Sequence, residues 1–368
     1  MKVAYLLGSL NRGGTETLLL DVFRNASQAP YSMIGIHRKG GAYNDDFYIA
    51  GPPMYRCAPK RLRFLCYLWQ IRKILLKEKI EIVHAQQPLD CLYACLALIG
   101  TKVRVVETFH GYDFTAKRFN KIINALSMHW ADGVCFVSQS QRDYYLKAYH
   151  ILRKQKTYVV YNGVDFSKFD THYPIPDFLK TSSKKVRLLM VGNFVHVRAQ
   201  NVIIESLARL HDNGVNSYDF YFVGRKHEKE AWRYENCVRF CKEHRLTDHV
   251  HFVGGRGDVP AILQYMDAFI YATAHDTFGI AVVEAMATGL PVVVNDWDVM
   301  KEITHDGEWA KLYKTGDIDD CANTIKNLLE NINEAKIKAK ERVPLIQKTY
   351  SIDTHIQSLN DVYKRVSK

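Results

Sequence analysis

The sequence contains no uninterrupted apolar run of the ~20 residues that a membrane-spanning helix needs. Its eight cysteines include no Cys-x-x-Cys pair, so we expect neither a structural zinc site nor a disulfide framework. Free thiols in that number are typical of a reducing compartment, which predicts a cytoplasmic location. No aromatic-basic motif of a nucleic-acid-binding module is present either, so we expect no nucleic-acid partner.

What the sequence does contain is typical of a globular protein. The hydrophobic share is 47% and the charged share 24%. A chain of 368 residues predicts two domains of ordinary size. Strand and helix patterns alternate, and they predict an α/β fold with a first domain over 1–170 and a second over 185–350. A proline-containing linker over 171–184 and a final amphipathic helix over 351–368 complete the organisation.

The positive charge is concentrated in the first half. Residues 1–180 hold 25 Lys and Arg against 14 Asp and Glu, whereas residues 181–368 hold 25 of each. An anionic partner of the first half, such as a membrane surface, would explain this asymmetry, and so would a merely solvated basic surface. The segment Lys60–Lys79 predicts a basic amphipathic helix, which fits either an anionic membrane or the domain core.

The stretch Ile270–Asp296 carries the clearest chemical signal. It predicts a strand, a polar loop ending at Gly279, a helix over Ile280–Thr288 and a second buried strand. Backbone N–H groups at the helix start, those of Ile280 and Ala281 among them, can hold a phosphate. Asp276 and Glu284 flank that helix start, an arrangement that suits a nucleotide-sugar site. An ordinary strand-helix-strand unit would give the same spacing.

Three other loops follow predicted strands. Gly13-Gly14 opens the first helix and can bring backbone N–H groups to an anion, although a tight turn explains it equally well. His110 follows the strand ending near Thr108, at the edge where open α/β sheets bind ligands. The loop Asn193–Arg198 follows the first strand of the second domain, and the guanidinium of Arg198 can bind phosphate oxygens in a bidentate manner.

Several of these segments together resemble family 4 of the retaining glycosyltransferases. Glu284-Ala285-Met286-Ala287-Thr288-Gly289 with Pro291-Val292-Val293, preceded by Phe278-Gly279, is similar to the acidic-x7-acidic signature, with Asp276 in the place of the first glutamate. Gly13-Gly14-Thr15-Glu16 and the segment Tyr161–Phe169 resemble further segments of the family. In its arginine-lysine phosphate motif, Asn193 and Arg198 stand at the two cationic positions.

The resemblance implies the GT-B fold, with two Rossmann-like domains facing each other across a cleft and a terminal helix returning to the first. It also implies the following roles: His110, Arg198 and Asp276 in catalysis; Gly13, Gly14, Asn193, Arg198, Gly279, Ile280 and Ala281 at the donor diphosphate; Glu284, Gly254 and Gly224 at the nucleoside; and Asp276, Thr277, Phe278 and Gly279 at the sugar. No metal and no cofactor are expected.

The implied reaction transfers a sugar, with retention, from a nucleotide-sugar donor (UDP-sugar favoured) to a glycan or polyprenyl-diphosphate-linked acceptor in bacterial surface polysaccharide assembly. The donor is expected mainly on the second domain and the acceptor on the first. We expect the enzyme in the cytoplasm, with a peripheral position at the inner membrane face as the finer hypothesis. Two alternatives stay open: a non-catalytic nucleotide-sugar-binding paralogue and a GT-B nucleotide-sugar epimerase.

Overall fold

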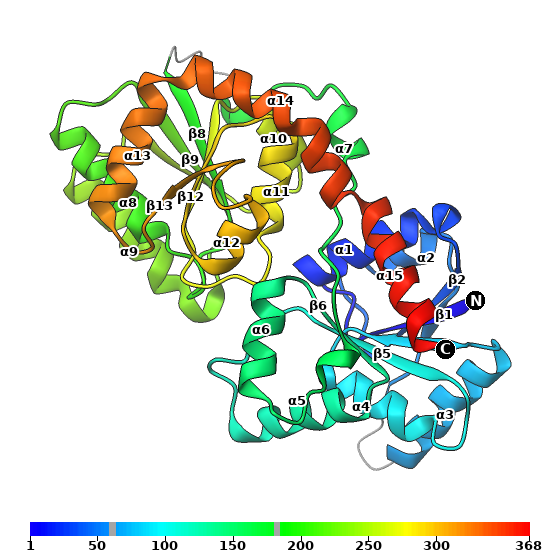
Figure 1. Cartoon of the computed structure of the whole chain (residues 1–368). Helices are drawn as coiled ribbons and strands as arrows, with labels where there is room; N and C mark the ends of the chain where they lie inside the picture. Colours follow the sequence, from blue (N-terminus) through cyan, green and yellow to red (C-terminus); the bar gives the residue numbers. More distant parts are fainter. Residues whose placement is uncertain (59–63, 180–184) are drawn as a thin grey trace. The chain divides into compact units, whose positions relative to one another are not determined.

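The computed structural model describes residues 1–58, 64–179 and 185–368. The chain divides into two compact α/β units, each built on one parallel sheet (Figure 1). Unit 1 consists of Met1–Asp165 together with Tyr350–Lys368, and unit 2 of Phe166–Thr349. The α/β class predicted from the alternating pattern is therefore confirmed.

Unit 1 contains a seven-stranded sheet in the order β3-β2-β1-β4-β5-β6-β7, with every neighbouring pair parallel. Its inner strands are almost wholly buried, and most of their residues are apolar, because helices cover both faces of such a sheet. The strands are β1 Lys2–Leu7, β2 Ser32–His37, β3 Met54–Arg56, β4 Ile82–Ala85, β5 Arg104–Phe109, β6 Gly133–Phe136 and β7 Thr157–Val159.

The helices of unit 1 form two layers with separate cores. Helices α3, α4, α5 and α6 pack on one face of the sheet, and α1, α2 and α15 on the other. Their bounds are α1 Gly14–Arg24, α2 Asn44–Ile49, α3 Phe64–Lys77, α4 Pro88–Ala97, α5 Arg118–Trp130, α6 Gln139–Ala148 and α15 Ile352–Val366.

The C-terminal helix α15, drawn in red in Figure 1, belongs to unit 1 although it follows unit 2 in the chain. Backbone hydrogen bonds join Val164 to Tyr350 and Ile352, and these bonds fix where the helix begins. Its apolar face, which includes Ile356 and Leu359, packs in the same core as β1. The predicted return of this helix to the first domain is confirmed.

Unit 2 contains a six-stranded parallel sheet in the order β10-β9-β8-β11-β12-β13. The strands are β8 Val186–Val191, β9 Tyr218–Val223, β10 Val250–Gly254, β11 Ala268–Tyr271, β12 Val292–Asn295 and β13 Lys311–Tyr313. The helices are α7 Ser167–Asp170, α8 Gln200–Asp212, α9 Ala231–Glu243, α10 Val259–Gln264, α11 Ile280–Ala287, α12 Asp298–Ile303, α13 Ile318–Glu330 and α14 Ile332–Tyr350, whose last residue is counted with unit 1.

Five short elements have no counterpart in the sequence prediction, namely α2, β3, α7, α12 and β13. Each has only three to six residues, too few to show a period of either kind. The predicted helix over 60–79 is present as α3, and its first four residues, Lys60–Arg63, lie outside the described residues. The same holds for 180–184, the end of the expected linker.

Candidate functional site

The helix start predicted to bind phosphate lies at the carboxyl edge of the unit 2 sheet. Gly279 caps α11 with φ +88°, a left-handed conformation that favours glycine. A Cβ at this position would also lie 2.8 Å from Cε of Met300. Ile280 and Ala281 form the first turn of α11, are partly exposed, and have no i−4 carbonyl within the helix. This arrangement can bind an anion.

Arg198 and Asp276, which come from different loops, meet at this edge. Nη1 of Arg198 lies 3.1 Å from Oδ2 of Asp276, and both side chains are largely buried. Tyr271, at the end of β11, donates its hydroxyl to the same carboxylate oxygen at 2.9 Å. The guanidinium carbon also lies 5.4 Å from the centre of the Tyr271 ring. The guanidinium is therefore held at the carboxyl edge of the sheet by one carboxylate and one aromatic ring.

The other oxygen of Asp276 is also engaged. Oδ1 accepts the backbone N–H of Thr277 at 2.8 Å, and the indole of Trp297 donates to the backbone carbonyl of Asp276. Phe278 is 1% exposed, so its side chain is part of the core and only its backbone can face a ligand. Glu284 is partly exposed on α11, four residues beyond its start.

The glycines and the asparagine of the neighbouring loops have structural roles of their own. Asn193 accepts the backbone N–H of Arg225 through Oδ1 at 2.9 Å, which ties the end of β8 to the end of β9. A Cβ on Gly224 would lie 2.0 Å from the carbonyl oxygen of Gly192. The backbones after β8 and β9 therefore approach so closely that only glycine fits at this position. Gly254 has φ +82° with open space beside it.

An Asp-x-Asp sequence, Asp296-Trp297-Asp298, directly follows β12. Oδ1 of Asp296 accepts the backbone N–H and the hydroxyl of Thr315, at 2.8 and 2.7 Å. Asp298 lies 3.2 Å from Nζ of Lys301. Asp296 is thus tied to the loop after β13, and Asp298 is paired within α12. Among the described residues, no group of three or more His, Cys, Asp or Glu side chains could hold a metal ion.

In unit 1, Gly13 and Gly14 form the start of α1. Gly13 has an extended backbone, with φ −159°. A Cβ at this position would meet only the carboxylate of Glu16. A Cβ on Gly14 would meet nothing within 4 Å. Neither Gly13 nor Gly14 has the left-handed backbone that makes glycine necessary at Gly279. Without side chains, both leave the helix start open to a ligand.

His110 follows β5 at the carboxyl edge of the unit 1 sheet, as predicted. It lines a hollow of about 340 Å³ together with Thr15, Glu16 and Gln86. Burial, followed by the charge of His355, lowers the pKa of His110 to about 3, so the ring is neutral at pH 7. Its Nε2 lies 2.8 Å from Oε1 of Gln86.

Asp113, three residues beyond His110, is used internally. Its carboxylate accepts hydrogen bonds from Asn124, Tyr144 and Tyr149, and the side chain is buried. These contacts anchor α5 and α6 to the loop after β5. Gln86 and Tyr271 are the site residues that sequence reasoning missed. Both stand at the carboxyl ends of strands. The rule that selected His110, that ligands bind at this edge of the sheet, could therefore have found them too.

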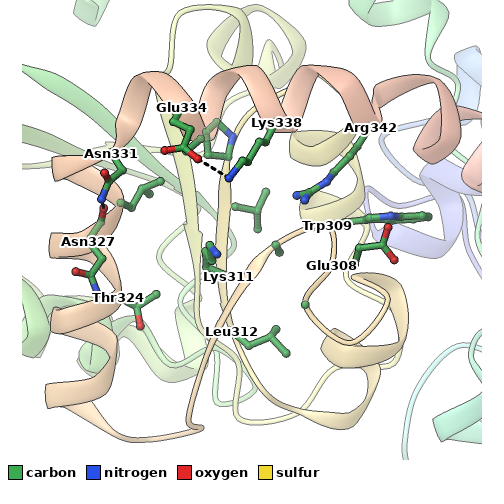
Figure 2. Close-up of a pocket in the computed structure, with 17 residues that line it drawn as sticks. Glu308, Trp309, Lys311, Leu312, Thr324, Asn327, Asn331, Glu334, Lys338 and Arg342 are labelled. Carbon is green, nitrogen blue, oxygen red and sulfur yellow. Dashed lines mark hydrogen bonds and ion pairs between the residues drawn. The ribbon is translucent and has the colours of Figure 1, made fainter.

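A further hollow of unit 2, about 650 Å³ in volume, lies at the opposite edge of the sheet (Figure 2). It lies among α13, α14 and the beginnings of β12 and β13, and Lys311, Lys338 and Arg342 are among its lining residues. Lys338 is paired with Glu334 at 2.5 Å. Because ligands of open α/β sheets bind at the carboxyl edge, we place the candidate site around Arg198 and α11 rather than here.

Comparison with known proteins identifies the fold and the family. The profile described as "Glycosyltransferase Family 4" matches residues 12–168, and that described as "Glycosyl transferases group 1" matches residues 175–343. The structure is similar to that of Anabaena HepE in complex with UDP, with a TM-score of 0.86, 18% identity and coverage of 99% of this chain and 100% of that one.

Two curated relatives share low sequence identity with this chain but align over most of its length. The N,N'-diacetylbacillosaminyl-diphospho-undecaprenol alpha-1,3-N-acetylgalactosaminyltransferase of Campylobacter jejuni is 26% identical over 329 residues, covering 83% of this chain and 82% of that protein. The N-acetyl-alpha-D-glucosaminyl L-malate synthase of Bacillus anthracis is 23% identical over 274 residues, covering 71% and 68%. The chain belongs to glycosyltransferase family 4 and is a retaining glycosyltransferase with the GT-B fold.

Proposed function

We propose that this enzyme transfers a sugar from a UDP-sugar to a glycan carried on a polyprenyl diphosphate, in the assembly of a bacterial surface polysaccharide. The observation that carries the donor assignment is Arg198, held by Asp276 next to the start of α11. The UDP bound by the Anabaena protein and the diphospho-undecaprenol in the name of the Campylobacter enzyme support this choice of substrates.

In the proposed reaction the bond between C1 of the sugar and the diphosphate oxygen breaks. The acceptor hydroxyl forms a new bond to C1 on the same face, and its proton passes to the departing phosphate oxygen. Negative charge grows on the diphosphate as it leaves. Arg198 and the N–H groups of Ile280 and Ala281 would stabilise that charge, which is the kind of electrostatic assistance that contributes most in many enzymes.

Because a guanidinium and a helix start supply positive charge, we propose that transfer does not depend on a divalent metal. Transfer is measured in buffer treated with EDTA and again after addition of Mg²⁺ or Mn²⁺. We expect the rate to stay within about twofold in all three conditions. A rate that vanishes with EDTA and returns with one metal would overturn this part of the proposal.

The donor assignment is tested by thermal stabilisation with UDP-, GDP- and ADP-sugars. We expect a shift with UDP-sugars that is lost in Arg198→Ala and in Glu284→Ala. Arg209→Ala is the matched control, since Arg209 is an exposed arginine of unit 2 whose ion-pair partner is the surface residue Asp319. No shift with any nucleotide would overturn the donor site.

A non-catalytic nucleotide-sugar-binding protein is the second candidate. It is favoured by the engagement of Asp276 with Arg198 and Tyr271, and by the role of Asn193 in joining two strand ends. The two functions differ in turnover. An enzyme releases UDP from its donor when acceptor is added, whereas a binding protein shows the thermal shift and releases none.

We further propose that unit 1 binds an anionic membrane surface, where a polyprenyl-linked acceptor would be found. The sequence of unit 1 holds 26 Lys and Arg against 14 Asp and Glu, whereas unit 2 holds 24 against 25. No helix among the described residues is both long and apolar enough to cross a bilayer. We propose that the contact with the membrane is made by a surface of unit 1.

The α3-α4-α5 layer offers such a surface, with α4 in contact with both of its neighbours. Along α5, four large apolar side chains are exposed at intervals of three or four residues: Phe119, Ile122, Leu126 and Trp130. This spacing places them in one stripe on the helix. Leu65, Trp69 and Leu76 are exposed on α3 in the same way.

The charges exposed on α3 and α5 are positive, and the one acidic residue of α4, Asp90, is buried and paired with Arg38. The stretches 64–77, 91–106 and 114–131 contain no aspartate or glutamate. Exposed cations accompany the apolar stripes: Lys73, Lys77, Lys102, Lys117, Arg118 and Lys121. Apolar and cationic side chains without acidic ones are the combination that binds to anionic lipid headgroups.

Sedimentation with lipid vesicles tests this surface. The protein should sediment with vesicles that contain phosphatidylglycerol. A much smaller fraction of it should sediment with vesicles of phosphatidylcholine alone. We expect Phe119→Ser with Trp130→Ser, and separately Lys117→Glu with Lys121→Glu, to weaken binding by at least about tenfold. Ile337→Ser, at an exposed apolar position of unit 2, is the matched control. Equal binding of all variants would contradict the proposal.

A further inference from the structure

Gln86 stands in an unusual position for a buried amide. It follows the last residue of β4, and its backbone N–H is bonded to the carbonyl of Leu6, so the β1 edge fixes its place. The residue is 6% exposed and lines the hollow of about 340 Å³ at the carboxyl edge of the unit 1 sheet. Its two polar atoms are used very differently.

The oxygen of this amide is occupied. Oε1 lies 2.8 Å from Nε2 of His110, and because burial keeps that ring neutral, a hydrogen bond here places the single ring proton on Nε2. Nδ1 of His110 then carries the lone pair. Gln86 thus selects one of the two tautomers of a histidine that lines the same hollow.

The nitrogen of the amide has no such partner. Nε2 of Gln86 is buried, and no hydrogen-bond acceptor reaches it among residues 1–58, 64–179 and 185–368. Buried hydrogen-bond donors in native proteins are nearly always paired, because an unpaired one has lost its hydrogen bond to water without gaining another and so destabilises the fold. A donor left open in the wall of a hollow is therefore suited to an oxygen that arrives with a ligand.

The other walls of the hollow favour an oxygen-rich ligand. Thr15 and Glu16, in the first turn of α1, line it, as do the histidine and the backbone of Gly111. The start of α1 has no side-chain cap, and helix starts favour anionic oxygens. Sugar hydroxyls and phosphate oxygens both meet these conditions, and both occur in the substrates proposed above.

We propose that Gln86 binds substrate and positions His110 at once: Oε1 accepts the Nε2–H of His110, and Nε2 donates to a hydroxyl or phosphate oxygen of the substrate in this hollow. The inference rests on the proposed function for the identity of the substrate. The bond to His110 does not depend on it. A change at Gln86 should therefore alter both the histidine tautomer and the affinity for one substrate.

Gln86→Met tests both parts, because methionine has similar length and neither donates nor accepts strongly. In ¹H–¹⁵N spectra of histidine-labelled protein at pH 7, wild-type His110 should show the Nε2–H tautomer, and the variant a mixture of the two. In transfer assays the KM of one substrate should rise at least tenfold while the KM of the other stays within twofold. Gln28→Met, an exposed glutamine of unit 1, is the control and should match wild type.

Two outcomes would overturn the proposal: wild-type His110 in the Nδ1–H tautomer, or variant KM values within twofold of wild type for both substrates. Should Gln86→Met fail to fold, the wild-type protein still decides. The resonances of the Gln86 side-chain NH₂ group should shift when either the sugar donor or the acceptor substrate is added to saturation. If they stay unchanged with both substrates, the Gln86 amide nitrogen binds only water. If wild type transfers no sugar but shows the Nε2–H tautomer, the proposed function fails and the positioning of His110 stands.

Discussion

Oδ2 of Asp276 lies 3.1 Å from Nη1 of Arg198, and this pair joins the loop after β8 to the loop after β11. The family resemblance implied that both act in catalysis, with Arg198 at the diphosphate and Asp276 at the sugar. In the structure they form a single, largely buried unit with Tyr271. Removal of either charge should therefore affect the orientation of the other.

This pair gives the first prediction. Arg198→Met and Asp276→Asn should each lower kcat/KM by about 100-fold, because each removes one charge of a largely buried pair at the proposed donor site. The double variant should be much less impaired than the product of the two effects, with a coupling free energy of about 1–3 kcal/mol. Steady-state kinetics of the four proteins measures it. Strict additivity would show that the two residues act independently.

The part of this arrangement that the sequence predicted is the part fixed by local rules. The strand-loop-helix pattern located Gly279 and the start of α11, since a left-handed residue before a helix needs glycine. Spacing along the chain could not show that Arg198 meets Asp276, which lies 78 positions later in the sequence. The engagement of Asn193 with Arg225, likewise, depends on how closely β8 and β9 end together.

Two glycines assigned to the same ligand group should respond differently to alanine. Gly279→Ala forces a left-handed residue and a contact 2.8 Å from Cε of Met300, so we expect a loss of about 1–3 kcal/mol in stability. Gly14→Ala adds a methyl group to open space in a helix and should leave stability unchanged or slightly raised.

Thermal unfolding and donor turnover of both variants distinguish fold from function here. Gly14→Ala should unfold at the wild-type temperature or above and still turn over more slowly, because the new methyl group lies where backbone N–H groups would meet the ligand. Wild-type turnover in Gly14→Ala would remove this helix start from the site.

Glu107 predicts a pH effect on stability. The carboxyl is fully buried in β5, and burial raises its pKa from 4.5 to about 8, with the Ser127 hydroxyl opposing the shift. The folded protein then holds a proton that the unfolded chain releases above pH 4.5, so this contribution to stability is lost as pH rises toward 8.

Glu107→Gln removes that titration and keeps the shape. We expect the difference in unfolding free energy between the variant and wild type to move in favour of the variant by about 1.5 kcal/mol from pH 6.5 to 8. Urea unfolding at both pH values gives the difference. A constant difference across this range would mean that Glu107 is already ionised in the folded protein.

Tyr363 predicts how strongly α15 is held to unit 1. Its hydroxyl lies 2.7 Å from Nδ1 of His84 and 3.1 Å from the hydroxyl of Tyr5, all three being buried. Tyr363→Phe leaves these groups short of one partner and should destabilise unit 1 by about 1–3 kcal/mol. Amide hydrogen exchange of α15 should quicken accordingly. Unchanged exchange in this helix would contradict the role assigned to the hydroxyl.

The most direct test of the whole account is the product of one reaction. The protein is incubated with an α-linked UDP-sugar and a polyprenyl-diphosphate-linked glycan, and the new linkage is examined by ¹H NMR. We predict an α-linked product from the wild-type protein and a product reduced by about 100-fold with Arg198→Met. A β-linked product, or equal amounts of product from both proteins, would contradict retaining transfer at the site formed by Arg198, Asp276 and α11.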